Sequence, residues 1–333
     1  MFGEPLWAAT QTSLTPGSSL KPAMGRYILE RLVGGVITVW FIATATFFAM
    51  HAVPGDPLMN EKAATPEIRA NLAKQYGLDR PLPEQYVIFL GNMVQGDFGI
   101  SFTQQNRRVN DIIRDHFPVS ALLGVLAIGI AAAGGIVWGA ITALYRNRLP
   151  DVVIMSLVIL CISVPSFVFA ALGQLALVNV NQWFGVSILP VAGWGTLAHM
   201  LMPALVLGLG TMALLTRLMR SSMLDVINED YVRTAKAKGL SKTRIFTHHQ
   251  LRNAILPVVT VLGPQVAAIT TGGFVVEMIF AIPGLGRYFV QAVQQLDYTV
   301  IMGTTVFYGA FLVFMVIVVD ILYGFIDPRV RLK

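Results

Sequence analysis

The sequence predicts an all-α protein that crosses a membrane with six transmembrane helices. Composition is the first reason, because 55% of the residues are hydrophobic and only 13% are charged, whereas soluble domains carry roughly 25% charged residues. The second reason is a series of apolar runs near the ~20 residues that a helix needs to span a bilayer. The third is that lysine and arginine gather in alternate connections between these runs, as they do in multi-pass membrane proteins.

The six predicted transmembrane helices are the runs that carry few charges. They lie at 32–53, 117–144, 152–178, 200–216, 255–276 and 300–326. With its basic start, the first helix is expected to occupy 26–53, after an N-terminal tail at 1–25. Residues 117–326 then form the predicted core, and 327–333 form a C-terminal end.

Basic residues near the ends of the runs predict the orientation, because they are retained on the cytoplasmic side. The connections that contain them include Lys21, Arg26, Arg31, Arg146, Arg148, Arg329, Arg331 and Lys333. Residues 179–199 contain no lysine or arginine, and the segment after the fifth run contains only Arg287. Both termini and the basic segment, defined as residues 217–254, are therefore expected in the cytoplasm.

The first outer connection, residues 54–116, is long but nearly neutral, with eight acidic and seven basic residues. Within it, Tyr86, Phe89, Leu90 and Met93 fall at helical spacing, and a turn marked by glycines follows. Two interpretations remain open. The connection is either a small outer subdomain that meets a partner or a helix lying on the membrane surface.

The start of the chain is not expected to be a cleaved signal sequence, because residues 1–23 contain no sufficiently long apolar core. The first transmembrane helix is then an uncleaved signal anchor. Met24 opens "MGRYILERL", which would itself make a natural start, so the tail is expected to be an extension without a fixed fold or no part of the natural protein. Cys161 is the only cysteine and lies in an apolar run, which predicts no disulfide.

The basic segment has the pattern of a helix, a tight turn and a second helix. Leu224, Ile227, Tyr231 and Ala235 recur every three or four residues, which predicts an amphipathic helix. Gly239 is typical of the residue that follows a helix end, Ser241 can cap the next helix, and Pro257 stands where that helix meets the membrane. Small residues at 235, 237 and 239 would let another backbone approach. The residues alone leave two alternatives, contact with a partner protein or with anionic lipid.

The stretch "DYVRTAKAKGLSKTRIFTHHQLRNAILPVV" closely resembles the cytoplasmic signature loop of permease subunits from bacterial binding-protein-dependent ABC importers. The family pattern is roughly Glu-Ala-Ala, three residues, Gly, nine residues, Ile, one residue, Leu-Pro. In this chain Arg233-Thr234-Ala235 replace the opening, Gly239 matches the fixed glycine, and Leu256-Pro257 come several residues late. The peptide and nickel branch typically reads Arg-Thr-Ala-Arg-Ala-Lys-Gly-Leu, which residues 233–240 resemble with one lysine for arginine.

Other segments resemble the same branch from Met24 onward. They are "VPGDP", "GDFGISF", "FPVSA", "VPSF", "MRSSMLDV", "PGLG" and "DILYGFIDPR". Together they look most like the B-type permease of oligopeptide or dipeptide importers, with glutathione and nickel permeases close behind. The resemblance implies a type I ABC importer permease fold with an extracytoplasmic subdomain between the first two transmembrane helices, in a bacterial cytoplasmic (inner) membrane.

The resemblance also implies partners and a division of labour. The partners would be a homologous second permease, two ABC ATPases, an extracytoplasmic substrate-binding protein, a peptide substrate and membrane lipid, with no nucleic acid. ATP and Mg would be held by the ATPases, and this chain would need no cofactor or metal and would not be an enzyme. It has no Gly-Lys pair and hence no P-loop. The residues that the resemblance assigns to ATPase coupling are Tyr231, Arg233, Thr234, Ala235, Lys236, Ala237, Lys238, Gly239, Leu240 and Ser241.

Candidates for the transport pathway come from helix-breaking and polar residues inside the apolar runs. Pro165 in the third run and Gly263-Pro264 in the fifth can kink those helices, and kinks in a membrane are tolerated where protein or water satisfies the freed backbone. Gln265 follows in a set of polar and small residues that could line a passage or permit tight helix packing. Packing is the interpretation we favour from the sequence.

Isolated ionisable residues near the membrane receive structural interpretations. Glu277 is expected to pair with Arg287 or to lie at a helix end, and Asp320 to meet Arg329 or Arg331. His248 and His249 are adjacent and have no accompanying carboxylates, so no metal site is predicted. A proton-coupled secondary transporter is disfavoured because the runs lack central ionisable residues and similar halves. An intramembrane hydrolase is disfavoured because Ser156, Ser163, Ser166 and His199 form no motif.

Overall fold

The computed structural model describes residues 20–53, 74, 77–104 and 107–326. Within these ranges the chain is helical, and its one β-bridge joins Ile100 to Arg108. Five helices are long and apolar enough to cross a membrane, and a bent helix pair raises the number to six if the pair is one span. The predicted all-α class is confirmed, and the predicted six transmembrane helices are confirmed if the bent pair is counted as one span. The tail at 1–19 and the end at 327–333 lie outside the described residues.

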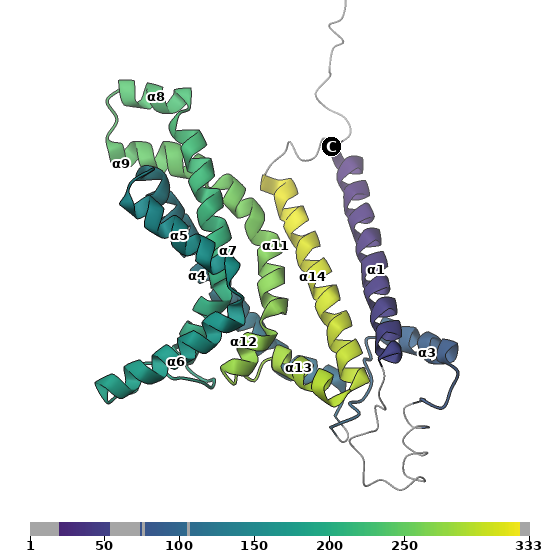
Figure 1. Cartoon of the computed structure of the whole chain (residues 1–333). Helices are drawn as coiled ribbons and strands as arrows, with labels where there is room; N and C mark the ends of the chain where they lie inside the picture. The colour runs from purple at the N-terminus through teal and green to yellow at the C-terminus, as the bar shows by residue number, and fades with distance from the viewer. Residues whose placement is uncertain (1–19, 54–73, 75–76, 105–106, 327–333) are drawn as a thin grey trace, which may run out of the picture.

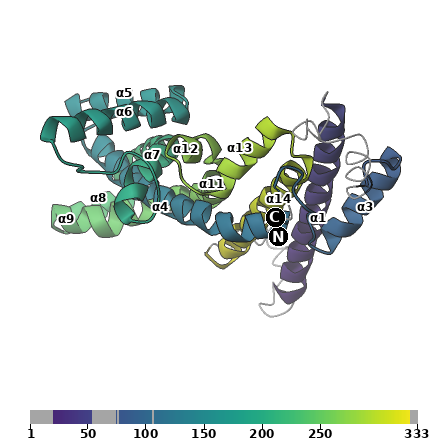
Figure 2. The same ribbon diagram turned by 90° about the horizontal axis from the view of Figure 1, so that it is seen from below.

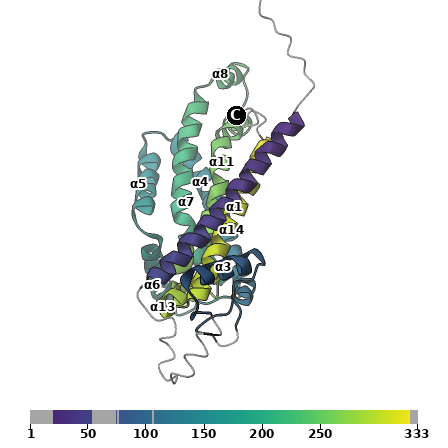
Figure 3. The same cartoon turned by 90° about the vertical axis from the view of Figure 1, so that its right-hand side faces the viewer.

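The first and last helices pack side by side at one edge of the molecule and run in opposite directions (Figure 1 and Figure 3). They are α1 (Leu20–Ala52) and α14 (Tyr298–Ile326). α1 begins before residue 26, where the sequence placed the start of the first transmembrane helix. At the other edge lie α5 (Leu149–Ser163) and α6 (Ser166–Phe184), as the view from below shows (Figure 2).

The centre is formed by α4 (Val109–Leu144) and α7 (Leu197–Ile227), both longer than their apolar runs. α4 begins at Val109 rather than 117 because Val109, Ile112 and Ile113 pack on the start of α14 while charged neighbours face outward. α7 ends at Ile227 rather than 216 because Met219 and Met223 continue its buried face. The first eleven residues of the basic segment, 217–227, therefore belong to α7.

Glycines allow the backbones of α4 and α7 to touch. A Cβ atom added at Gly139 would stand 2.7 Å from the Thr216 carbonyl oxygen, and one at Gly208 would stand 2.7 Å from that of Ala127. Small residues at helix interfaces favour association in membranes, where apolar surface alone gives no preference for another helix over lipid. The α4–α7 pair therefore depends on the absence of side chains at these two positions.

The third predicted helix, 152–178, is wrong as a single span. The helix breaks at Val164, which is extended (φ −99°, ψ 128°), and resumes as α6 after Pro165. Proline disfavours the helical conformation in the residue before it and has no N–H to donate. α5 lies along α7, whereas α6 leads away from α7 (Figure 1). Pro165 thus changes the chain direction, as predicted, but it ends a helix rather than bending one.

The fifth predicted helix, 255–276, is also interrupted. α11 (Leu256–Gly272) is followed by α12 (Phe274–Ile279), and the chain then turns into α13 (Leu285–Gln295). The helical stretch 242–254 meets α11 at 47°. This bend lies at Ile255, just before Pro257. α11 continues through Gly263 and Pro264 without an interruption.

The outer connection contains the predicted helix, α3 (Leu82–Val94), which packs across the end of α1. The Phe47 side chain of α1 is 2% exposed and stacks on Phe89 with ring centroids 5.5 Å apart. The Thr44 and Tyr86 hydroxyls share a hydrogen bond of 2.7 Å. These contacts pack α3 against α1, and the two interpretations of this connection stay predictions. Residues 54–73 of this connection lie outside the described residues.

Asp297, 1% exposed, ties the outer connection to α14. Its carboxylate caps α14 by accepting the Val300 N–H at 3.2 Å. The same carboxylate accepts the hydroxyls of Ser101 at 2.5 Å and Thr103 at 2.9 Å. One side chain therefore fixes both the start of the last transmembrane helix and the strand-like segment before α4.

Glu277 lies at a helix end, which was one of its two predicted explanations. Its carboxylate is buried and accepts the backbone N–H of Arg287 at 3.2 Å, in the first turn of α13. Gly284, the residue before α13, has no side chain to serve as a cap. Glu277 therefore supplies the acceptor that a capping side chain would provide, and Arg287 takes part in this hydrogen bond through its backbone N–H. The side chain of Asp320 lies outside the described part of the chain.

The α4–α7 contact predicts opposite effects for two glycine substitutions in one helix. Gly139→Ala should lower the melting temperature of the purified protein, because the new methyl group meets the Thr216 carbonyl and forces the helices apart. Gly129→Ala is the matched control, since no atom lies within 4 Å of its Cβ position and alanine favours a helix by about 1 kcal/mol. Equal melting temperatures for the two variants would contradict this packing.

Candidate functional site

The basic segment folds into a short protruding helix, α8 (Asp230–Ala237), which stands at one end of the molecule (Figure 1). Its C-terminus has the geometry of a Schellman motif. The Gly239 N–H donates to the Lys236 carbonyl at 3.0 Å, and the Leu240 N–H donates to the Ala235 carbonyl at 3.3 Å. Gly239 has φ +73°, which residues with a Cβ rarely adopt. The predicted glycine turn is therefore present.

A small apolar cluster holds α8 against the returning chain. Val232 and Ala235 are buried against Ile245, with Val226 and Leu240 at the margin. The returning chain consists of α9 (Lys242–Arg244), the π-helix η2 (Ile245–Leu251) and α10 (Arg252–Ala254). As predicted, Ser241 caps it, because its hydroxyl accepts the Arg244 N–H at 3.4 Å. α8 is thus a preformed unit with its own packing.

The cluster corrects two expectations about the apolar face. α7 ends at Ile227 and α8 begins at Asp230, so Leu224, Ile227, Tyr231 and Ala235 do not form one stripe on one helix. Ala235 is buried within the chain and cannot meet another backbone. Tyr231 is partly exposed, and its hydroxyl accepts a hydrogen bond from Asn253 Nδ2 at 3.0 Å. Val232 and Ile245 could not be identified from the sequence, because they pack against each other from two different helices, α8 and η2.

The outward face of α8 is basic and sterically open. Arg233, Lys236 and Lys238 are exposed, as are Thr234 and Ala237. A Cβ at Gly239 would have no atom within 4 Å. Arg233 lies 3.5 Å from Asp230, but both side chains are exposed, so the pair contributes little. This face can therefore approach another molecule closely and offers it positive charge.

An ion pair near this end, absent from the sequence predictions, joins α5 to α7. Arg220 Nε and an Nη donate to the two Asp151 carboxylate oxygens, each at 2.8 Å. The Asn147 N–H also donates to Asp151, at 2.9 Å, and the Asp151 side chain is 5% exposed. Paired and almost buried, the carboxylate fixes the start of α5 to α7. The only indication of this ion pair in the sequence was the position of Asp151, just before an apolar run.

A hollow of about 520 Å³ lies where α5 and α6 separate beside α7. It brings Pro165 of the break together with Gln265 of α11, two of the predicted pathway residues. Gly263 is elsewhere, against the Val319 side chain of α14, and Pro264 does not line the hollow. Thr211 Oγ1 donates to Gln265 Oε1 at 3.0 Å across the α7–α11 contact. Of the four predicted pathway residues, two therefore line the hollow, Gly263 makes a close helix contact, and Pro264 does neither.

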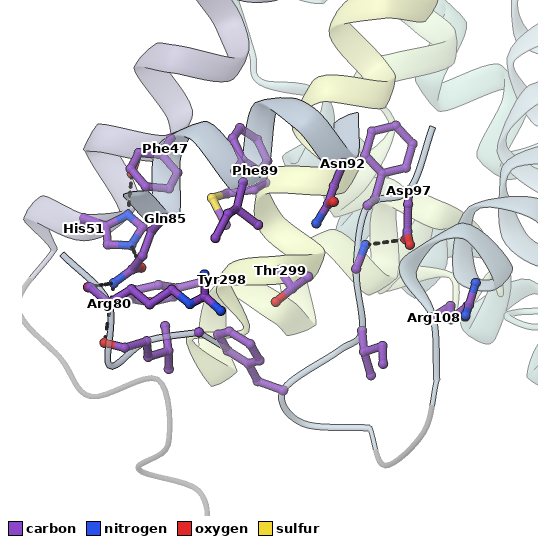
Figure 4. Close-up of a pocket in the computed structure, with 18 of the residues that line it drawn as sticks. Phe47, His51, Arg80, Gln85, Phe89, Asn92, Asp97, Arg108, Tyr298 and Thr299 are labelled. Atoms are coloured by element: carbon purple, nitrogen blue, oxygen red, sulfur yellow. Dashed lines mark hydrogen bonds between the residues drawn. The ribbon is translucent and has the colours of Figure 1, made fainter. Parts of the chain in front are cut away.

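A second hollow, of about 380 Å³, lies between α1, α3 and the start of α14 (Figure 4). His51 Nε2 lies 3.3 Å from Gln85 Oε1, and Gln85 Nε2 donates to the Arg80 carbonyl at 2.8 Å. Asp97 accepts the Gly99 N–H at 2.9 Å. These polar groups form hydrogen bonds within the protein. The hollow therefore marks the place where the segment containing α3 packs against α1 and α14. Among the described residues, no three His, Cys, Asp or Glu side chains gather to hold a metal ion.

Comparison with known proteins gives matches along nearly the whole chain. Residues 135–332 match the family described as "Binding-protein-dependent transport system inner membrane component", and residues 24–124 match "Binding-prot-dependent transport system membrane comp, N-term". One similar solved structure, titled "Crystal structure of an amino acid ABC transporter with histidines", has a TM-score of 0.49 at 15% identity and covers 64% of this chain and 93% of that one.

Named relatives are similar at much higher identity. The dipeptide transport system permease protein DppB of Bacillus subtilis is 46% identical over 93% of this chain and 99% of its own length. The oligopeptide transport system permease proteins OppB of Haemophilus influenzae and Escherichia coli are 40% and 37% identical, each over 92% of this chain and 100% of their own. The chain is therefore a multi-pass membrane protein of the binding-protein-dependent transport system inner membrane component family, in its branch of B-type peptide permeases.

Proposed function

We propose that this chain is a transmembrane subunit of an ATP-driven importer that moves short peptides across the bacterial cytoplasmic membrane by alternating access. The observation that carries the proposal is that relatives named as dipeptide or oligopeptide permeases match it over nearly its full length. In this proposal it pairs with a homologous second permease and receives peptides from an extracytoplasmic binding protein. Two ABC ATPases hold ATP and Mg²⁺ on the cytoplasmic side.

The orientation in this proposal places α8 and both termini in the cytoplasm. The positive-inside rule favours it, because lysine and arginine concentrate in the basic segment while residues 179–199 contain neither. The outer subdomain around α3 then faces the binding protein. The long axis of α7 connects the two sides, since its far end continues into the basic segment.

α8 has the properties of a coupling element between an ATPase and the helices. Its basic outward face is available to a partner, and its inner face is fixed by the cluster of Val232, Ala235 and Ile245. A displacement of α8 is therefore transmitted to α7 through Val226, and to α11 through η2 and α10. The Asp151–Arg220 ion pair carries a displacement of α7 on to α5, whose far end borders the hollow.

Gly239→Glu should uncouple ATP hydrolysis from transport. The position is open to partners and needs φ +73°, so a glutamate both strains the turn and adds a negative charge to the contact. In proteoliposomes holding the assembled transporter, peptide uptake should fall roughly 5- to 150-fold, the usual range of an allosteric coupling energy, while ATP hydrolysis continues. Uptake at the wild-type rate would exclude α8 as the coupling element.

The matched control for Gly239→Glu is Gly185→Glu. Gly185 also ends a helix with positive φ, +67°, and also has no atom within 4 Å of its Cβ position. The backbone strain is thus similar, of order 1–3 kcal/mol, but the site lies after α6, away from α8. Uptake should be nearly unchanged in this variant, and an equal loss in both would attribute the effect to strain alone.

Asp151→Asn should weaken both stability and coupling. The substitution leaves the Arg220 guanidinium without its carboxylate, a loss of up to about 3 kcal/mol for a largely buried pair. The number of peptides imported per ATP hydrolysed should fall, because α5 no longer follows α7. A double-mutant cycle with Arg220→Gln measures the pair directly, and additive effects of the two substitutions would show that the pair transmits nothing.

A further inference from the structure

The hollow beside α7 is lined by three segments that are distant in sequence. They are the break between α5 and α6, one face of α7 and Gln265 of α11. Its volume of about 520 Å³ lies within the roughly 300–1,000 Å³ of small-molecule sites. Its walls are mainly apolar, with side chains such as Phe169, Leu207 and Leu214. Apolar walls with a few polar groups are typical of a ligand site.

The polar groups of the hollow have unused hydrogen-bonding capacity. Thr211 occupies Gln265 Oε1, but the Gln265 amide nitrogen donates to no residue that the structure describes. At the break, Pro165 carries no N–H, so the Cys161 carbonyl lacks the donor that a continuous helix would supply. Broken backbone at membrane depth persists only inside protein or beside a water-filled cavity. This wall is therefore unsuited to lipid acyl chains and suited to a peptide, which offers both N–H and C=O groups.

Arg217 supplies the charge of the hollow, and no acidic residue lines it. Its guanidinium is exposed and makes no ion pair with any side chain in the described ranges. Arg220, one helical turn further along α7, has Asp151 as its partner. An unpaired guanidinium at the border of a mainly apolar hollow is complementary to a carboxylate, which it can bind through two parallel hydrogen bonds.

We propose that the hollow between α5, α6, α7 and α11 holds the C-terminal part of a short peptide during its passage, and that Arg217 binds the terminal carboxylate. The inference rests on the proposed function, since it names a contact for that substrate. The Gln265 amide then donates to a peptide carbonyl, and the break at Pro165 leaves a backbone acceptor for a peptide N–H. Arg217 is a substrate-binding residue that favours a free C-terminus over a blocked one.

Cys161 borders the hollow and is the only cysteine of the chain, so its reactivity reports on occupancy. The assembled transporter, without its binding protein, is treated with N-ethylmaleimide, and alkylation of Cys161 is followed by mass spectrometry. Trialanine should slow the alkylation, whereas trialanine amide, which lacks the carboxylate, should slow it much less. In Arg217→Gln the trialanine concentration for half protection should rise roughly tenfold or more, as expected for one lost hydrogen bond to a charged group.

Two further variants make the result specific. Arg217→Lys keeps the charge and should restore part of the protection. Arg146→Gln removes an exposed arginine outside the hollow and should leave the protection unchanged. Equal protection by both peptides, an unchanged Arg217→Gln variant, or a parallel loss for both peptides would overturn the inference; the last would indicate a lipid or structural role for Arg217.

Two other outcomes have separate meanings. A Cys161 that never reacts in the assembled transporter would show that the second permease covers the hollow, and the inference would fall while the proposed function stands. Uptake of trialanine by the wild-type transporter with its binding protein is measured in parallel. If that transporter imports neither trialanine nor longer peptides, the proposed function fails, and this inference fails with it.

Discussion

The close approach of α4 and α7 holds the centre of the molecule together. In a membrane, apolar surface alone does not draw helices together, so the approach depends on atoms that are missing at Gly139 and Gly208. The contact supports α7 along its length. The helix continues at one end toward α8, and along one face it borders the hollow where α5 and α6 part. In the proposed function, this arrangement lets a displacement at one end of α7 reach the other.

Two arginines on neighbouring turns of α7 show how similar residues receive different roles from their surroundings. Arg220 meets Asp151 in a bidentate pair that binds two helices together. Arg217 faces the hollow, whose lining contains no carboxylate. In sequence both were simply basic residues that favour the cytoplasmic side. The difference arises because α5 returns along α7 and brings its one acidic residue to Arg220.

Local signals in the sequence were sufficient for the helical class and the glycine turn, but they were insufficient for features that depend on a distant segment. Gly239 and Ser241 were predictable because a left-handed residue and a helix cap depend on the nearest backbone. The early start of α4 was not, because Val109 is buried by α14 and not by its own neighbours. The break at Pro165 was expected only as a kink. To predict the burial of Ala235 and the Asp151–Arg220 pair, one would need to know how helices that are distant in sequence pack against each other. Of the candidate pathway residues, Pro165 and Gln265 come together, while Gly263 serves a helix contact.

In the proposed function, α8 touches an ATPase subunit and passes its motion to α7. The most direct measurement is site-directed cross-linking in the assembled transporter, with Cys161→Ser as background and Ala237→Cys on the exposed face of α8. A maleimide that carries a photoreactive group, attached to position 237 and activated by light, should join it to an ATPase subunit, both without nucleotide and with bound ATP. Val186→Cys, which is also exposed and follows α6, should give no such product. If position 237 joins no ATPase subunit in either nucleotide state, the account is contradicted.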